Sequence, residues 1–184
     1  MYVESETASS GEYLTATEVL SQYRTQIVRG TEFIDFDRTK MSTLRQLMCI
    51  YKRPGIELKK NPDIHFVGEC GADVGGPTKE FFHTALASLN KVDPLYNFQL
   101  FTGEHGHLVP LYGADVHSSG CFEMAGKLLA HSVLHGGGGM EGLAPAIVEY
   151  LSTGSLEEAS RLVTSADVAD VDLRMLIEEK VRSM

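Results

Sequence analysis

The sequence has few cysteines and no excess of positive charge. Its three cysteines, Cys49, Cys70 and Cys121, are odd in number and far apart, which argues against a disulfide framework and against a zinc site with close ligand pairs. The formal net charge is -9 at pH 7, so no overall positive field would recruit nucleic acid or an anionic membrane. We therefore expect a reducing compartment, and partners that are proteins or small molecules.

Long hydrophobic runs are also absent. No run of about 18 apolar residues occurs, which argues against a membrane-spanning helix. The first residues, MYVESETASSGEY, are acidic and polar, whereas a signal peptide begins with a basic segment followed by an apolar one. The sequence thus predicts a soluble protein of the cytoplasm or nucleus, and we expect residues 1–15 to form a disordered leader.

Apolar residues are nevertheless plentiful, and most of them recur at helical spacing. The chain has 184 residues, 43% of them hydrophobic, enough for the core of one domain or of a large piece of one. Thr15 and Glu18 have the spacing of a capping box, and so do Ser155 and Glu158. Helices are predicted over 15–29, 38–53, 77–89, 121–135 and 143–151, from residue 155 onward, and over 173–181.

Two stretches have the patterns of strands instead. Residues 63–68, DIHFVG, alternate polar and apolar side chains well enough for a buried strand. Two apolar runs, 98–101 and 108–111, flank a segment that contains Gly103 and Gly106, as in a β-hairpin. The predicted fold class is therefore α+β and predominantly helical, with a short strand and a β-hairpin.

The most unusual stretch is GADVGGPTKEFF, residues 71–82. A phosphate-binding loop would need G-x-x-x-x-G-K-[ST], but here Pro77 removes a backbone donor and no hydroxyl residue follows Lys79. A corner between a strand and a helix fits better, because proline suits the first turn of a helix and glycines allow the chain to reverse before it. We expect Phe81 and Phe82 to anchor that helix in the core.

Four histidines are candidate site residues. His131 and His135 stand one helical turn apart and could share a zinc ion, but Ser132 occupies the place of the glutamate in H-E-x-x-H. A pair of surface or helix-end histidines is the simpler interpretation, because cations near a helix C-terminus interact favourably with its dipole. His105 and His107 are predicted to face water on the hairpin turn.

HGGGG, residues 135–139, is similar to the oxyanion loop of α/β-hydrolases. That chemistry needs a nucleophile, and no G-x-S-x-G elbow occurs, so we interpret the glycines as a flexible helix cap and linker. Among the thiols, Cys49 is expected to be buried and inert, Cys121 to belong to the core, and Cys70 to lie in a turn between carboxylates that would weaken its reactivity.

The order of these features resembles a known family. FVGECGADVGGPTKEFF, residues 66–82, is similar to the F-x-G-E-x-G-x-D-x-G-G-P-x-x-E-F-F segment of HECT-type E3 ubiquitin ligases. The residues around CFEMAGKLLAHSVLHGG also agree in order, so the resemblance extends from about Arg38 to Val181. Cys70 and Lys79 depart from the pattern, where an acidic residue and an arginine are common, and the tetraglycine indicates a divergent branch.

The resemblance implies a fold and a set of structural residues. Residues 16–184 would form a partial HECT domain, the large subdomain of the N-lobe, without a C-lobe. The motif residues would build its scaffold rather than a site for catalysis, a cofactor or a metal, and they are Gly71, Asp73, Gly75, Gly76, Pro77, Glu80, Phe81 and Phe82.

The resemblance also implies a function. HECT ligases take ubiquitin from a conjugating enzyme onto a C-lobe cysteine and pass it to a substrate lysine, which is thioester catalysis. Nothing here resembles the L-P-x-A-x-T-C-x-N segment of that lobe, and Cys49, Cys70 and Cys121 match no transfer cysteine. The chain is thus expected to be inactive alone, with the conjugating enzyme, ubiquitin and substrates as partners of a longer protein. The alternative is a non-catalytic interaction module that retains the scaffold.

Overall fold

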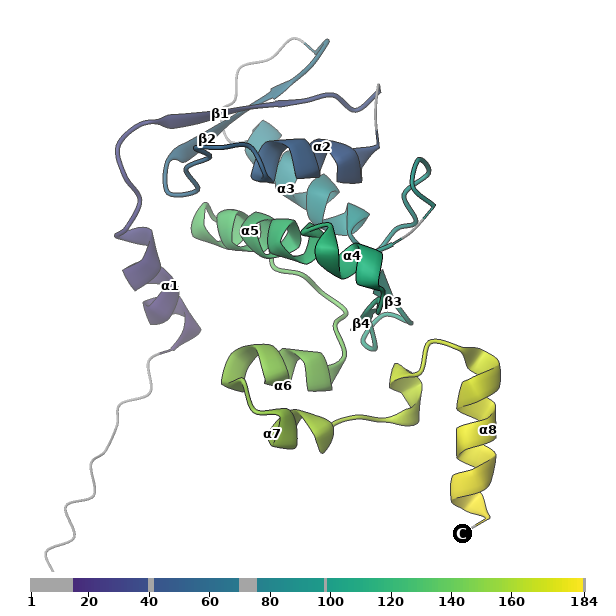
Figure 1. Ribbon diagram of the computed structural model, residues 1–184. Helices are drawn as coiled ribbons and strands as arrows, with labels where there is room; N and C mark the ends of the chain where they lie inside the picture. The colour runs from purple at the N-terminus through teal and green to yellow at the C-terminus, as the bar shows by residue number, and fades with distance from the viewer. Residues whose placement is uncertain (1–14, 40–41, 70–75, 98, 184) are drawn as a thin grey trace, which may run out of the picture.

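The computed structural model describes residues 15–39, 42–69, 76–97 and 99–183, which form an α+β fold dominated by helices (Figure 1). Its α-helices are α1 (Ala16–Arg24), α2 (Thr43–Tyr51), α3 (Gly76–Ser88), α4 (Ala114–Ser118), α5 (Cys121–Leu134), α6 (Pro145–Thr153), α7 (Leu156–Ser160) and α8 (Val171–Arg182). The strands are β1 (Thr31–Phe36), β2 (Asn61–Phe66), β3 (Phe101–Thr102) and β4 (Val109–Pro110), and a short 3-10 helix, η1, spans Ser165–Asp167. The expected leader falls on residues outside the described ranges, except for Thr15.

The predicted strand at 63–68 is present as β2, but it has a parallel partner, β1, that the sequence pattern did not predict. Ile34 pairs with Ile64 and Phe36 with Phe66, and these side chains point into the core. β1 was missed because Phe33 and Ile34 are consecutive, which spoils the alternation of apolar and polar residues. Parallel strands need a long crossover connection, and here the chain that connects β1 to β2 contains α2.

The predicted β-hairpin is confirmed in a short form. β3 and β4 pair antiparallel, with Phe101 opposite Pro110 and Thr102 opposite Val109. The chain between them contains His105 and His107, as expected from the two apolar runs.

The core lies between the parallel sheet and three helices. Figure 1 places α2 and α3 between the sheet and α5, and α3 contacts both β2 and α5. Phe81 of α3 meets Phe36 of β1 edge to face, with ring centroids 5.2 Å apart, and Phe82 lies next to it. Both phenylalanines are fully buried, so α3 is anchored in the core as its aromatic pair predicts.

The starts predicted for α1, α6 and α7 are confirmed, whereas the helix predicted from residue 38 begins at Thr43. Thr15 Oγ1 accepts a hydrogen bond from the Glu18 N–H, and the Glu18 carboxylate accepts one of 2.7 Å from the Thr15 N–H. Ser155 accepts a bond of 3.2 Å from the Glu158 N–H at the start of α7, and Pro145 opens α6. Local capping chemistry therefore sets these boundaries.

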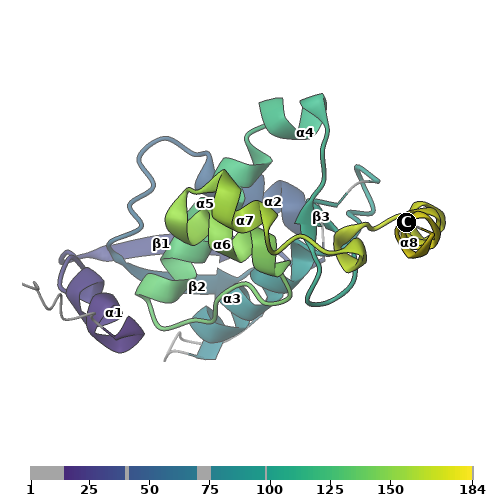
Figure 2. The ribbon, with the colours of Figure 1, turned by 90° about the horizontal axis from the view of Figure 1, so that it is seen from below.

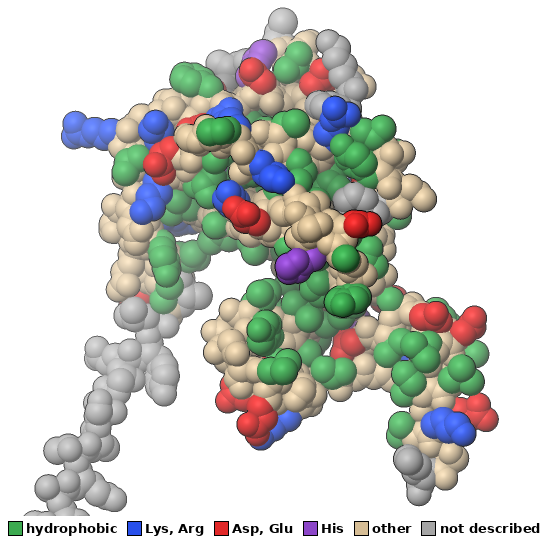
Figure 3. Space-filling model, viewed as in Figure 1, with side chains coloured by type: hydrophobic (Ala, Val, Ile, Leu, Met, Phe, Trp, Pro, Cys, Tyr) green, Lys and Arg blue, Asp and Glu red, His purple; other side chains and the backbone are tan. Residues whose placement is uncertain are grey.

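The last three helices stand below the core and expose much of their apolar surface (Figure 3). α6 and α7 pack against each other, while Leu151 and Leu156 remain 68% and 74% exposed. None of the residues Val171–Arg182 in α8 is buried. None of the helices in the described ranges combines the length and hydropathy that a bilayer crossing requires.

Candidate functional site

The glycine-rich corner leads from β2 into α3, and the structure describes part of it. Gly71, Asp73 and Gly75 lie outside the described residues, as does Cys70. α3 begins at Gly76, so Pro77 lies in its first turn as predicted, where its missing N–H costs no intrahelical hydrogen bond.

The two sides of this corner are joined by Arg38, which nothing in the sequence pattern singled out. Its Nη1 lies 2.8 Å from Glu80 Oε1 on α3, and its Nε lies 3.5 Å from Glu69 Oε1 just after β2. The Arg38 guanidinium carbon also lies 3.7 Å from the centroid of the Phe66 ring, a cation–π geometry. Arg38 therefore bridges three residues of the family-like motif from a segment far away in sequence.

Behind the corner, a buried histidine completes the packing of α3 against α5. His131 is fully buried, its Nδ1 shares a hydrogen bond of 3.0 Å with the Tyr51 hydroxyl, and its ring meets that of Phe82 edge to face at 5.1 Å. Burial lowers the pKa of His131 to about 3, with His135 adding to the effect, and burial also raises the pKa of Tyr51. Both side chains are therefore uncharged at neutral pH.

The interpretation of His131 and His135 as a surface or helix-end pair is wrong for His131. Its position continues the stripe of Cys121, Met124 and Leu128, so helical periodicity places it in the core despite its polarity. His135 Nε2 donates to the Leu58 carbonyl over 2.8 Å.

The zinc hypothesis gains no support from this arrangement. The Leu58 carbonyl occupies Nε2 of His135, and the Tyr51 hydroxyl occupies Nδ1 of His131, whose Nε2 is buried without a hydrogen-bond partner. Within the described ranges, no group of three or more His, Cys, Asp or Glu side chains is placed to hold a metal.

The tetraglycine after α5 is packed in part rather than a free linker, which corrects the expectation of a flexible linker. Gly136 has φ +78 and follows the helix cap, as expected. The Gly137 N–H donates to the Ser132 carbonyl over 2.7 Å, and Ser132 Oγ donates to the Gly138 carbonyl over 2.7 Å. A side chain at Gly137 would overlap Ser132 Oγ and stand 3.2 Å from Phe82 Cδ2, so close packing requires glycine here.

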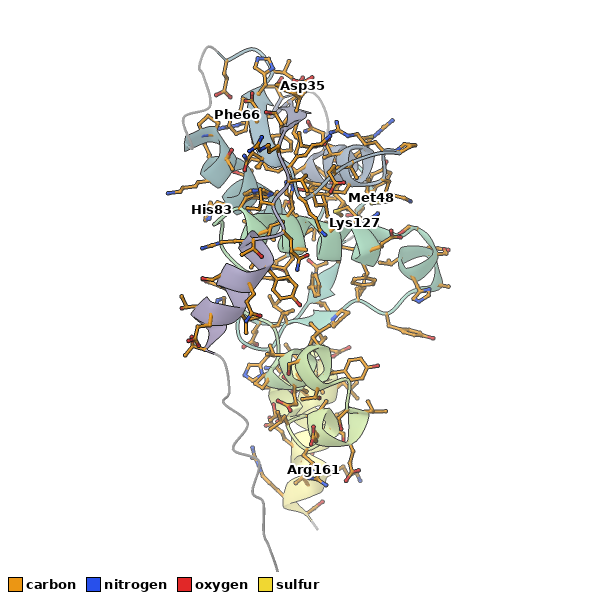
Figure 4. The ribbon with its side chains drawn as sticks, turned by 90° about the vertical axis from the view of Figure 1, so that its left-hand side faces the viewer. Asp35, Met48, Phe66, His83, Lys127 and Arg161 are labelled. Atoms are coloured by element: carbon orange, nitrogen blue, oxygen red, sulfur yellow. The ribbon has the colours of Figure 1, made fainter. Side chains whose placement is uncertain are left out.

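A groove of about 560 Å³ lies beside the tetraglycine. Its walls come from α3 and the residues after it, from the hairpin turn and from the chain after α5: Lys79, His83, Leu86, Ala87, Asn90, His105 and the residues 136–141. Figure 4 shows His83 on α3, below the sheet residue Phe66 in that view. Three segments that the sequence singled out thus meet at one surface.

The groove does not support hydrolase chemistry. No serine, threonine or cysteine is among its described lining residues. Ser132 touches the tetraglycine, but it is fully buried and already donates to Gly138. An oxyanion loop without a nucleophile in reach cannot perform acyl transfer.

The remaining candidate residues, two cysteines and two histidines, do not lie together at one site. Cys49 is exposed, against expectation, because it lies on the face of α2 opposite Leu44 and Tyr51, whereas Cys121 is buried as predicted. His105 is exposed as predicted, but His107 is not free in water: its Nδ1 lies 2.7 Å from Asp167 Oδ1. Burial would raise the pKa of Asp167, but hydrogen bonds from Thr164 and His107 outweigh burial and lower it.

Comparison of the chain with models of protein families, with curated proteins and with solved structures finds no match. The resemblance to HECT ligases therefore depends on the sequence motif alone.

Proposed function

We propose that the chain is the large subdomain of the N-lobe of a HECT-type E3 ubiquitin ligase, acting in the cytoplasm or nucleus. The observation that carries this proposal is the segment 66–82, in which the order of glycines, acidic residues, proline and paired phenylalanines is similar to the family pattern. Such a long ordered pattern is more specific than any one of its residues.

The contacts of the motif residues support a scaffold role. Phe66, Glu69 and Glu80 converge on Arg38, and Phe81 with Phe82 fills the core between β1 and α5. The described motif residues are thus engaged in bracing one corner. Residues that shape a backbone in this way are expected in a scaffold, whereas a reactive site would present a nucleophile or base to solvent.

In the proposed ligase, residues 16–184 hold the parts that carry out transfer and supply no reacting atom themselves. The transfer cysteine belongs to a C-lobe, and the conjugating enzyme delivers ubiquitin to it. Cys121 is buried and Cys49 has no match to a transfer cysteine, so neither thiol has this role.

The test is to read the transcript that encodes the chain past the codon of Met184, express its product and load it with activating enzyme, conjugating enzyme and ubiquitin. We expect a C-lobe with a Thr-Cys pair downstream and a thiol-sensitive ubiquitin adduct on that cysteine, abolished by Cys→Ser there. Residues 1–184 loaded alone should give no adduct. A reducible adduct on Cys49, Cys70 or Cys121 would contradict the assignment.

The alternative is a non-catalytic interaction module with the same scaffold. The exposed apolar residues of α6, α7 and α8 favour it, because large apolar surfaces on a soluble domain mark places where another protein binds. A native stop codon directly after that of Met184, together with absence of any adduct, would support the module over the ligase.

A further inference from the structure

The two-stranded parallel sheet leaves the outer edge of β1 without a neighbouring strand. In a parallel pair, alternate residues of each strand turn both their N–H and their C=O group toward the other strand. The Val67 N–H donates to the Phe36 carbonyl over 3.1 Å, so Phe36 and the other even-numbered residues of β1 face β2. The backbone groups of Thr31, Phe33 and Asp35 therefore point to the outer edge.

Most of these outer backbone groups have no partner. Arg53 Nη2 donates to the Phe33 carbonyl over 3.1 Å. Within the described part of the chain, no hydrogen bond reaches the N–H groups of Thr31, Phe33 and Asp35, or the carbonyls of Thr31 and Asp35. All three residues are exposed. A row of unpaired backbone donors and acceptors along a strand is a template for a further strand.

The other edge of the sheet, on β2, is blocked. Pro62 has no N–H group to offer there, and the Phe66 carbonyl accepts a hydrogen bond of 3.1 Å from the Glu69 N–H. Helix α3 also packs against β2, and Figure 2 shows α3 on the β2 side of the sheet. Of the two edges, that of β1 is the one at which a strand can be added.

We propose that the outer edge of β1 binds an extended segment of a partner protein as a third strand, antiparallel to β1. In antiparallel pairing, both backbone groups of an outer residue meet the same residue of the added strand. The residue opposite Phe33 needs no N–H group, because Arg53 already donates to the Phe33 carbonyl. Proline therefore fits at that position, beside a Phe33 ring that is 68% exposed.

The side chains of β1 indicate what else the partner segment carries. Asp35 has a side chain that is 78% exposed, and a basic residue directly opposite it would form a favourable cross-strand pair. The expected segment thus has a basic residue, then an apolar residue or proline two positions later, then a β-branched residue opposite Thr31. A second copy paired about Phe33 fits less well, because it would bring the two Arg53 guanidinium groups close together at the axis.

Amide hydrogen exchange measured by NMR tests whether the edge is open. In the free chain, the amides of Phe33 and Asp35 should exchange rapidly, whereas those of Ile34 and Phe36, which face β2, should be protected. Equal protection of both sets would show that the edge is already paired and would overturn the proposal. This readout needs neither ubiquitin nor a C-lobe, so it is independent of the proposed function.

A synthetic peptide, acetyl-Ser-Lys-Thr-Pro-Thr-Val-Ser-amide, is the binding probe. Added to the chain, it should shift the amide resonances of Phe33 and Asp35 and slow their exchange. Methylation of the peptide at the valine nitrogen, which faces Thr31, should weaken binding about 10-fold. Methylation at the preceding threonine nitrogen, which faces solvent, is the matched control and should have little effect. Absence of these shifts at millimolar peptide, or equal effects of the two methyl groups, would overturn the proposal.

Asp35→Pro and Asp35→Ala provide the matching test on the protein. Both remove the carboxylate, but only proline removes the outward N–H, and neither disturbs a hydrogen bond between β1 and β2. Asp35→Ala should bind the peptide within about 5-fold of the parent chain, and Asp35→Pro about 10-fold more weakly than Asp35→Ala, with unchanged helix content. Equal affinities would place the peptide elsewhere and contradict the proposal. Self-association of the parent chain that Asp35→Pro abolishes would assign the edge to a second copy instead.

Discussion

Replacing Gly137 with Ala should distinguish a packed tetraglycine from a free linker. The new methyl group would overlap Ser132 Oγ and press on Phe82, and the hydrogen bond from Ser132 to the Gly138 carbonyl would be displaced. Gly139 provides the matched control in the same run of glycines, since a side chain there would meet nothing within 4 Å. Neither glycine has a positive φ, so available space decides the outcome.

The magnitude follows from three contributions. Leaving the buried Ser132 hydroxyl unsatisfied costs about 1–3 kcal/mol, and forcing the methyl group against its neighbours costs about 1–3 kcal/mol. The smaller entropy of the unfolded alanine chain offsets about 0.4–1 kcal/mol. We therefore expect Gly137→Ala to lower the free energy of unfolding by about 1–5 kcal/mol, and Gly139→Ala to leave it unchanged or raise it by up to about 1 kcal/mol.

Urea denaturation followed by circular dichroism at 222 nm measures both variants against the parent chain. The difference should appear in the transition midpoint, with the slope unchanged. If the free energies of unfolding of the two variants agree within about 0.5 kcal/mol, the close packing of Gly137 against Ser132 and Phe82 does not contribute to stability.

Phe82→Ala should lower the free energy of unfolding by about 3 kcal/mol or more in the same titration, because Phe82 is fully buried. Phe33→Ala, on the exposed side of β1, should lower it by less than about 1 kcal/mol. Comparable losses would contradict the placement of Phe82 in the core. Burial lowers the pKa of His131 to about 3 in the folded protein, so below about pH 6.5 the unfolded chain binds a proton that the folded chain does not. As the pH is lowered from about 6.5, the free energy of unfolding should therefore decrease, by up to about 1.4 kcal/mol per pH unit. His131→Gln should reduce that slope in a pH series of urea midpoints, and an unchanged slope would show that the histidine titrates normally. Arg38→Ala should lower the free energy of unfolding by about 1 kcal/mol, because it removes two ion pairs and the contact with Phe66. Arg161→Ala, which removes one exposed ion pair with Glu157, should lower it by less than about 0.5 kcal/mol. Equal effects would show that the contacts of Arg38 contribute no more than an ordinary surface ion pair.

Local rules located seven of the eight α-helices in the described ranges, missed the short α4, and failed where neighbours along the chain gave mixed signals. Thr15 and Glu18 form the capping box of α1, and this motif is visible in the sequence because its two residues are always three positions apart. Phe33 beside Ile34 hid β1, whose identity as a strand depends on pairing with β2 thirty residues later. Cys49 was assigned to the core from its apolar neighbours, although its angle on α2 points it to solvent.

The candidate site was predictable only in its parts. The glycine-rich corner, the hairpin turn and the tetraglycine each stand out in the sequence, but no periodicity indicates that they form one groove. Arg38 carries no local signal, because its role depends on Glu69 and Glu80, more than thirty residues later in the chain, both lying close to its guanidinium.

The sequence by itself determined the helical α+β class, the capped helix starts and the resemblance of residues 66–82 to a ligase scaffold, because these depend on residues close together in the chain. Tertiary structure alone decided that His131 is a neutral core residue, that Ser132 holds the tetraglycine and that the apolar face of α8 is uncovered. Burial, unlike helix formation, is set by what packs against a residue from elsewhere in the chain, and amphipathic spacing in α5 and α8 is the same whether or not a neighbour arrives to cover it.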